Sequence, residues 1–112
     1  MKNFVQHGKT CTFTAPYDVS SGDGFLVGSI FAVANADAKS GEEVEGDCEG
    51  VFDLTRETGA STNFTAGTKV YWDNTNKRTT KTATSNTLIG AALLDAAVDD
   101  ATARVRLNGT VA

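Results

Sequence analysis

The stretch that most constrains the fold runs from residue 67 to residue 90. It holds two apolar runs, residues 70–72 and 88–89, on either side of a polar, threonine-rich link. Valine, isoleucine, threonine and the aromatic residues all favour extended chain. Because side chains alternate between the two faces of a strand, we expect Val70 and Trp72 to share one face and Tyr71 to lie on the other, and both faces need cover.

Alternation of apolar and polar side chains predicts further strands along the chain. We expect them over residues 9–15, 25–34, 42–54, 88–94 and 102–107, separated by turns rich in glycine, asparagine and aspartate. Gly28 would mark a bulge within a single buried strand, 25–34, at the centre of the core. On periodicity alone, the run that begins at Leu88 could instead form a helix through Ala97.

The run 42–54 carries its acidic residues on one side. Its alternation predicts a strand pair with one acidic face, and Gly46 and Gly50 would mark bends or a tight hairpin. The acidic residues of that face are Glu43, Glu45, Asp47, Glu49 and Asp53. A solvated outer face explains this pattern more simply than an acidic binding surface does. Residues 55–65 read as a loop with room for one short helical turn.

Length and composition place these strands in one small domain. The chain has 112 residues, of which 40% are hydrophobic and 21% charged, with one proline and 11 glycines. These values are typical of a globular chain of one domain, residues 1–112. Together with the strand spacing they predict an all-β fold, a small β-sandwich or β-barrel, in which residues 74–84 form a threonine-rich edge strand or arm.

Charge and hydropathy exclude several classes of function. The formal net charge of -4 disfavours bulk binding to nucleic acid or to anionic lipid. No apolar run approaches the roughly 20 residues of a membrane span. Residues 1–7 lack the apolar stretch of a secretory signal, so we expect the chain to stay in the compartment where it is made.

No motif for catalysis or for a cofactor stands out. Residues 8–10, Gly-Lys-Thr, resemble the end of a phosphate-binding loop, but Asn3 stands where that motif needs glycine. His7 is the single histidine and is expected at the surface. Residues 73–77 resemble the start of a calcium loop but lack its glycine and its final glutamate. We therefore expect no enzyme activity, no metal and no cofactor.

The two cysteines, Cys11 and Cys48, belong to neither a zinc pattern nor a disulfide framework. Each occupies an apolar position in an alternating run. Two reduced, small core side chains are the favoured interpretation, and a disulfide formed in an extracellular particle is the alternative.

Charge is distributed unevenly along the chain, since residues 37–57 are mainly acidic and residues 69–81 mainly basic. We hypothesise that the basic segment of one copy, or of the same chain, lies across the acidic strand and supports a symmetric oligomer. The candidate interaction residues are Lys69, Tyr71, Lys77, Arg78, Lys81, Glu43, Glu45 and Glu49. The basic segment 69–81 could alternatively bind single-stranded nucleic acid.

The chain resembles the small capsid decoration, or cement, proteins of tailed phages. The matching residues are 1–6, 21–24, 26–28, 41–44, 49–52, 67–73, 88–90 and 103–109. The resemblance implies a structural protein of the virion that binds the outer surface of an assembled head, often as a trimer, and clamps the major capsid protein. Some relatives carry a recombinase label, which this sequence contradicts because Asn3 breaks the phosphate loop and 112 residues cannot house such an ATPase core. A recombination-related nucleic-acid-binding accessory protein that uses the basic segment 69–81 is the alternative.

Overall fold

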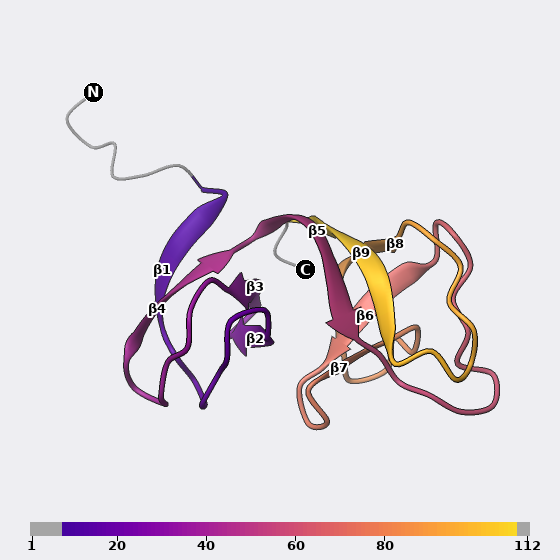
Figure 1. The fold of residues 1–112 in the computed structure, drawn as a ribbon, viewed down its shortest axis with the longest axis horizontal. Coiled ribbons are helices and arrows are strands. Elements are labelled where there is room, and N and C mark those ends of the chain that lie inside the picture. The colour runs from indigo at the N-terminus through magenta and orange to yellow at the C-terminus, as the bar shows by residue number, and fades with distance from the viewer. Residues whose placement is uncertain (1–7, 110–112) are drawn as a thin grey trace.

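The computed structural model describes residues 8–109, which form nine strands and no helix. The strands are β1 (Thr10–Thr14), β2 (Gly24–Val27), β3 (Ile30–Ala34), β4 (Glu43–Asp47), β5 (Glu49–Thr55), β6 (Lys69–Asp73), β7 (Arg78–Thr80), β8 (Thr87–Ala92) and β9 (Thr102–Asn108). They build two antiparallel sheets, ordered β1-β4-β3-β2 and β5-β9-β8-β6-β7 (Figure 1). The predicted all-β fold is confirmed, and β8 is a strand rather than the alternative helix. His7 lies outside the described residues.

Strand β3 is buried on both faces and connects two apolar clusters. Its residues Phe31 and Val33 join a cluster built mostly by the five-stranded sheet, whereas Ala32 and Ala34 join a cluster enclosed by the four-stranded sheet. Alternation along one strand thus supplies both cores. The expectation that the apolar run 25–34 lies at the centre of the core is confirmed for β3.

The run 25–34 is, however, two strands rather than one with a bulge. Val27 pairs with Ile30, so Gly28 and Ser29 alone form the turn of a β2–β3 hairpin. Gly28 has a φ of 60°, a conformation that glycine adopts without steric cost and that two-residue hairpins require. The prediction of a single strand was wrong because the turn has only two residues, Gly28 and Ser29, within a run that is otherwise apolar.

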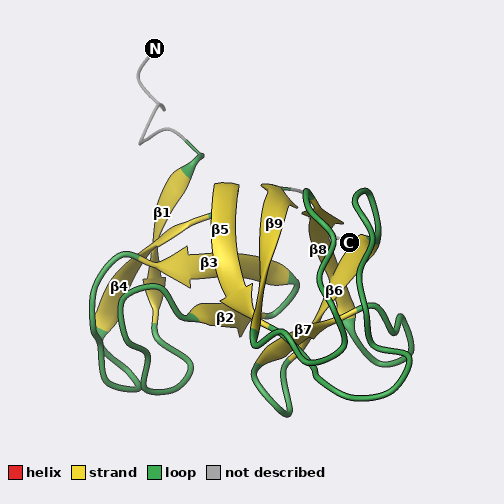
Figure 2. Ribbon diagram, turned by 45° about the vertical axis from the view of Figure 1, so that its right-hand side comes forward, coloured by secondary structure: helices red, strands yellow, loops and turns green. Residues whose placement is uncertain are grey.

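The run 42–54 is divided between the two sheets at Cys48. Strand β4 pairs with β1 and β3, whereas β5 pairs with β9. Gly46 lies where a Cβ would come within 2.8 Å of both Phe25 Cζ and Ala32 Cβ, so this glycine allows close packing and makes no turn. The predicted strand pair with one continuous acidic face was therefore wrong, and Figure 2 shows β4 and β5 running into different sheets.

The threonine-rich segment forms β7 at the edge of the five-stranded sheet, as predicted, but it is not an exposed arm. Thr79 and Thr80 are buried. The segment after β5 covers them: the Glu57 amide donates to the Thr79 carbonyl at 2.8 Å, and Thr79 Oγ1 donates to the Thr55 carbonyl at 2.9 Å. This cover protects an edge that would otherwise be open to pairing with another chain.

Residues 55–65 contain no helical turn and are organised around Arg56, which is 3% exposed. Its guanidinium donates hydrogen bonds to the carbonyls of Ala97, Asp100 and Thr62 and lies 5.0 Å from the centre of the Phe64 ring. One side chain thereby ties two long loops together. Over residues 8–109 no helix is long and apolar enough to cross a membrane.

Candidate interaction surface

The five-stranded sheet buries one face in the core and leaves the other open. We call the open face the outer face; its residues are Val51, Asp53, Lys69, Tyr71, Ala91, Leu93, Arg104 and Arg106. The strand register arranges them in cross-strand rows. One row is Val51, Arg106, Ala91 and Lys69, which are successive direct partners across β5, β9, β8 and β6. A second row is Asp53, Arg104 and Leu93, where the Leu93 amide donates to the Arg104 carbonyl at 3.0 Å.

The outer face carries exposed apolar side chains and a shallow depression. Val51 is 49% and Leu93 43% exposed, so this face carries apolar area that the chain itself does not cover. A depression of about 430 Å³ lies beside them, between Lys69, Ala91 and Arg106. It exists because the side chains of β8 are small at this point.

Gly90 accounts for the close approach of β8 and β9 beneath this depression. A Cβ on Gly90 would lie 2.0 Å from the Arg106 carbonyl oxygen, a separation that no side chain tolerates. The register between β6 and β8 also shifts here, next to Val70. The sheet is therefore bulged beneath the outer face, a device that often redirects side chains at functional surfaces.

The charges of the outer face are of two kinds. Arg104 forms a two-pronged ion pair with Asp53, with Nε to Oδ1 at 3.0 Å and Nη2 to Oδ2 at 3.3 Å. These hydrogen bonds hold the pKa of Asp53 below its usual range and raise the pKa of Arg104. By contrast, Lys69 and Arg106 form no ion pair within residues 8–109. They leave the outer face with uncompensated positive charge.

The structure separates the predicted acidic residues. Glu49 begins β5 at the border of the outer face, opposite Asn108. Glu43 and Glu45 are exposed on β4 in the other sheet, opposite Thr14 and Thr12 of β1. The three glutamates do not form one continuous surface.

The predicted basic residues are also divided. Lys69 lies on the outer face, next to Tyr71, whereas Lys77 packs its ammonium 4.4 Å from the centre of the Tyr17 ring. Two further basic residues have partners within the chain: Arg78 reaches Glu57 at 3.8 Å and Asp73 at 3.7 Å, and Lys81 donates to Asn63 at 3.4 Å.

Within one chain the basic segment therefore meets Glu57, just beyond β5, and not the carboxylates of β4. Contact between the basic segment of one copy and the acidic strand of another stays a prediction. The interaction roles of all eight candidate residues likewise stay predictions.

Sequence reasoning missed part of the outer face. Alternation predicted that Arg104 and Arg106 point outward, which they do, but nothing in the sequence placed Arg106 next to Val51 and Ala91. That neighbourhood depends on the pairing of β9 with β5 and β8. One signal for this face was present in the sequence, the apolar residues around Leu93. Leu93 continues an apolar run, but its side chain is exposed.

Other hollows of the described chain offer less chemistry. A cleft of about 530 Å³ lies between the sheets, bordered by Tyr17, Asp23, Asp53 and Lys77. Among residues 8–109, no three His, Cys, Asp or Glu side chains gather closely enough to hold a metal ion.

Comparison with known proteins extends over nearly the whole of this structure. The family model described as "Phage cement protein" matches residues 5–107. The match takes in both sheets and every residue of the outer face. No curated protein and no solved structure matches the chain.

Proposed function

Because the chain belongs to the phage cement protein family, we propose that it binds the outer surface of an assembled phage head and stabilises the shell. Membership of the family makes it a structural, capsid-associated phage protein. The finer proposal is that its partner is the major capsid protein, that it is made in the bacterial cytoplasm, and that it remains on the virion. The family match, which extends over both sheets, is the main support for this proposal.

The outer face is our candidate for the surface that meets the shell. It combines the exposed apolar side chains of Val51 and Leu93 with the cations Lys69 and Arg106, and Arg106 lies between Val51 and Ala91. Protein interfaces typically combine apolar contact area with polar and charged groups. The uncompensated positive charge favours a capsid surface that is acidic where the cement protein binds.

Assembly as a homo-oligomer, most simply a trimer on a local symmetry axis, would multiply contacts that are weak individually. Two linked binding events raise the overall affinity by about 10² to 10⁴ without any new contact. Glu43 and Glu45 lie on the other sheet from the outer face and so remain available for contact between copies. Sedimentation velocity at low and high salt would test this arrangement, because charge-mediated association weakens as salt screens it.

Reconstitution tests the proposal most simply. Heads that lack the protein are purified, mixed with it at micromolar concentration and sedimented. We expect the protein to co-sediment with expanded heads and to raise their resistance to heat or chelator. Absence of binding at that concentration would contradict the proposal.

Charge reversal on the outer face refines the test. Lys69→Glu and Arg106→Glu should each weaken head binding about tenfold, which corresponds to about 1.4 kcal/mol. Lys39→Glu is the matched control, since Lys39 is an 80% exposed lysine in a loop of the other sheet and undergoes the same charge change. Equal weakening in all three variants would indicate a general charge effect and exclude the outer face.

The alternative of nucleic-acid binding gains no support from the geometry. Trp72 is buried, and Lys77 and Arg78 have partners within the chain. A salt-dependent mobility shift of single-stranded DNA that disappears when Lys77, Arg78 and Lys81 are neutralised would favour nucleic-acid binding over capsid binding.

A further inference from the structure

The two cysteines of the chain lie on one face of neighbouring strands. Cys11 pairs with Gly46, and the Cys48 amide donates to the Lys9 carbonyl at 2.7 Å, which extends the β1–β4 ladder by one position. Cys48 is therefore opposite Lys9, two positions along from Cys11. Residues two positions apart on a ladder share a face, so the two thiols are diagonal neighbours.

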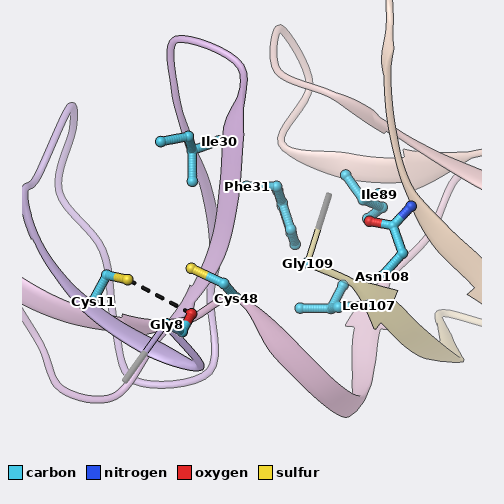
Figure 3. Close-up of a pocket in the computed structure, with 9 residues that line it drawn as sticks. All are labelled: Gly8, Cys11, Ile30, Phe31, Cys48, Ile89, Leu107, Asn108 and Gly109. Carbon is cyan, nitrogen blue, oxygen red and sulfur yellow. Dashed lines mark hydrogen bonds between the residues drawn. The ribbon is translucent and has the colours of Figure 1, made fainter. Parts of the chain in front are cut away.

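Both cysteines line the same cavity. It has a volume of about 190 Å³, and its walls include Phe31 and Leu107 as well as the two cysteines. Figure 3 shows the thiol groups turned toward each other beside the ring of Phe31. Both cysteines are free in this structure; Cys11 is half-buried, with its thiol donating weakly to the Gly8 carbonyl at 3.7 Å, and Cys48 is buried.

We propose that Cys11 and Cys48 form an intrachain disulfide when the protein leaves a reducing compartment. Diagonal strand neighbours have Cα atoms about 7 to 8 Å apart, and disulfides span up to about 6.8 Å, so the shift required is on the order of 1 Å. Strand β1 is free to make it, because β1 is an edge strand that pairs with β4 alone. The cavity supplies the room.

The chemistry is thiol–disulfide exchange with a small disulfide such as oxidised glutathione. The half-buried Cys11 sulfur attacks first, forming a mixed disulfide and releasing one glutathione thiolate, which takes up a proton. Cys48 then loses its proton to solvent and attacks the Cys11 sulfur, which expels the second glutathione. Two protein thiols are oxidised and one glutathione disulfide is reduced to two thiols.

The surroundings of Cys48 make this second step slow and its product durable. Burial, followed by the neighbouring Cys11, raises the pKa of Cys48 to about 11. Little Cys48 thiolate is present at neutral pH, so ring closure should accelerate as the pH rises. A stabilised thiolate would favour the reduced protein. Because the Cys48 thiolate is not stabilised, the equilibrium favours the disulfide.

The bond would fasten the edge strand β1 to the residue at which the chain passes between the sheets. Intracellular thiol buffers keep such a pair reduced, whereas an extracellular particle is oxidised. Oxidation of the cysteine pair on a released virion therefore rests on the proposed function, whereas the ability to form the bond does not. Closing the loop over β2, β3 and β4 should raise Tm by on the order of 10 °C.

The test uses the purified chain without heads, so its failure is distinct from failure of the proposed function. The protein is incubated with oxidised glutathione at several pH values, and free thiols and mass are followed. We expect the wild type to lose both free thiols and the mass of two hydrogen atoms. No covalent dimer should form. Cys48→Ser should instead retain one glutathione on Cys11, which shows that Cys11 reacts and needs Cys48 for release.

Three results would overturn the proposal: a wild type that keeps both thiols, a wild type that still retains glutathione at the most alkaline pH tested, or chains cross-linked to one another. Because all three are read on the wild type, they remain informative if a serine variant fails to fold. The rise in Tm after oxidation, reversed by a strong dithiol reductant, provides the independent measurement.

Discussion

The rings of Phe31 and Trp72 lie 4.9 Å apart, centre to centre, with their planes inclined at 52°. Phe31 comes from the four-stranded sheet and Trp72 from the five-stranded sheet, so this contact joins the two. The Trp72 indole also donates to Asn74 at 3.1 Å, and the Tyr17 hydroxyl reaches the same Asn74 oxygen at 3.2 Å. An aromatic contact and a shared polar acceptor thus hold the sheets together.

Trp72→Ala should lower the free energy of unfolding by about 3 to 5 kcal/mol, because it removes a 3% exposed indole from the main core. Trp72→Phe should cost less, since it keeps an aromatic ring against Phe31. Urea unfolding followed by circular dichroism measures both. A stable, well-folded Trp72→Ala that no longer assembles would place Trp72 in an interface instead.

Arg56→Lys should lower the free energy of unfolding by about 2 to 4 kcal/mol, because lysine keeps the charge but cannot reach three carbonyls with one planar fork. The control is Arg104→Lys, which alters an exposed arginine on a surface strand and should change stability little. Both are compared by urea midpoint. Equal, small effects would mean that Arg56 does not organise the two loops.

Gly90→Ala should lower the free energy of unfolding by about 2 kcal/mol or more, since the added methyl would overlap the Arg106 carbonyl. Gly8→Ala is the matched control, because a Cβ there has nothing within 4 Å. Thermal unfolding distinguishes the two. A Gly90→Ala variant as stable as the wild type would show that β8 and β9 separate easily.

Asp73 should contribute to the acid sensitivity of the fold. Its carboxylate accepts hydrogen bonds from the Asn76 side chain and from the amides of Asn76 and Thr75, which lower its pKa. A carboxyl with a lowered folded pKa stabilises the fold above its unfolded pKa, about 3.9, and this contribution is lost as the pH falls through the folded pKa. Asp73→Asn should therefore flatten the stability profile below about pH 4. Urea midpoints at several acidic pH values test this; profiles that run parallel would contradict it.

Much of the five-stranded sheet could be predicted from the sequence. Its strands alternate apolar and polar side chains, as expected for a sheet with one buried face. Ala103, Val105 and Leu107 are buried and Arg104 and Arg106 exposed, as alternation requires. Val70 and Trp72 share one face and Tyr71 lies on the other for the same reason, and the structure shows that the face of Trp72 is the buried one. Local pattern is sufficient where one face meets the core and the other does not.

Long-range pairing could not be predicted in the same way. The alternation of acidic and other residues continues through Cys48 from β4 to Glu49 of β5, although the two strands belong to different sheets. Thr79 and Thr80 have polar side chains but are buried, because the segment at Glu57 covers them. The outer face was missed for the same physical reason, since Arg106 acquires its neighbours only when β9 pairs on both sides.

We propose that this cement protein lies on the outside of the shell with the outer face of its five-stranded sheet toward the capsid. Electron cryomicroscopy of heads reconstituted with the wild-type protein tests it most directly. We predict density outside the shell, with β9 and β8 nearest the capsid subunits and β1 furthest from them. Density inside the shell, or the four-stranded sheet turned toward the capsid, would contradict the account.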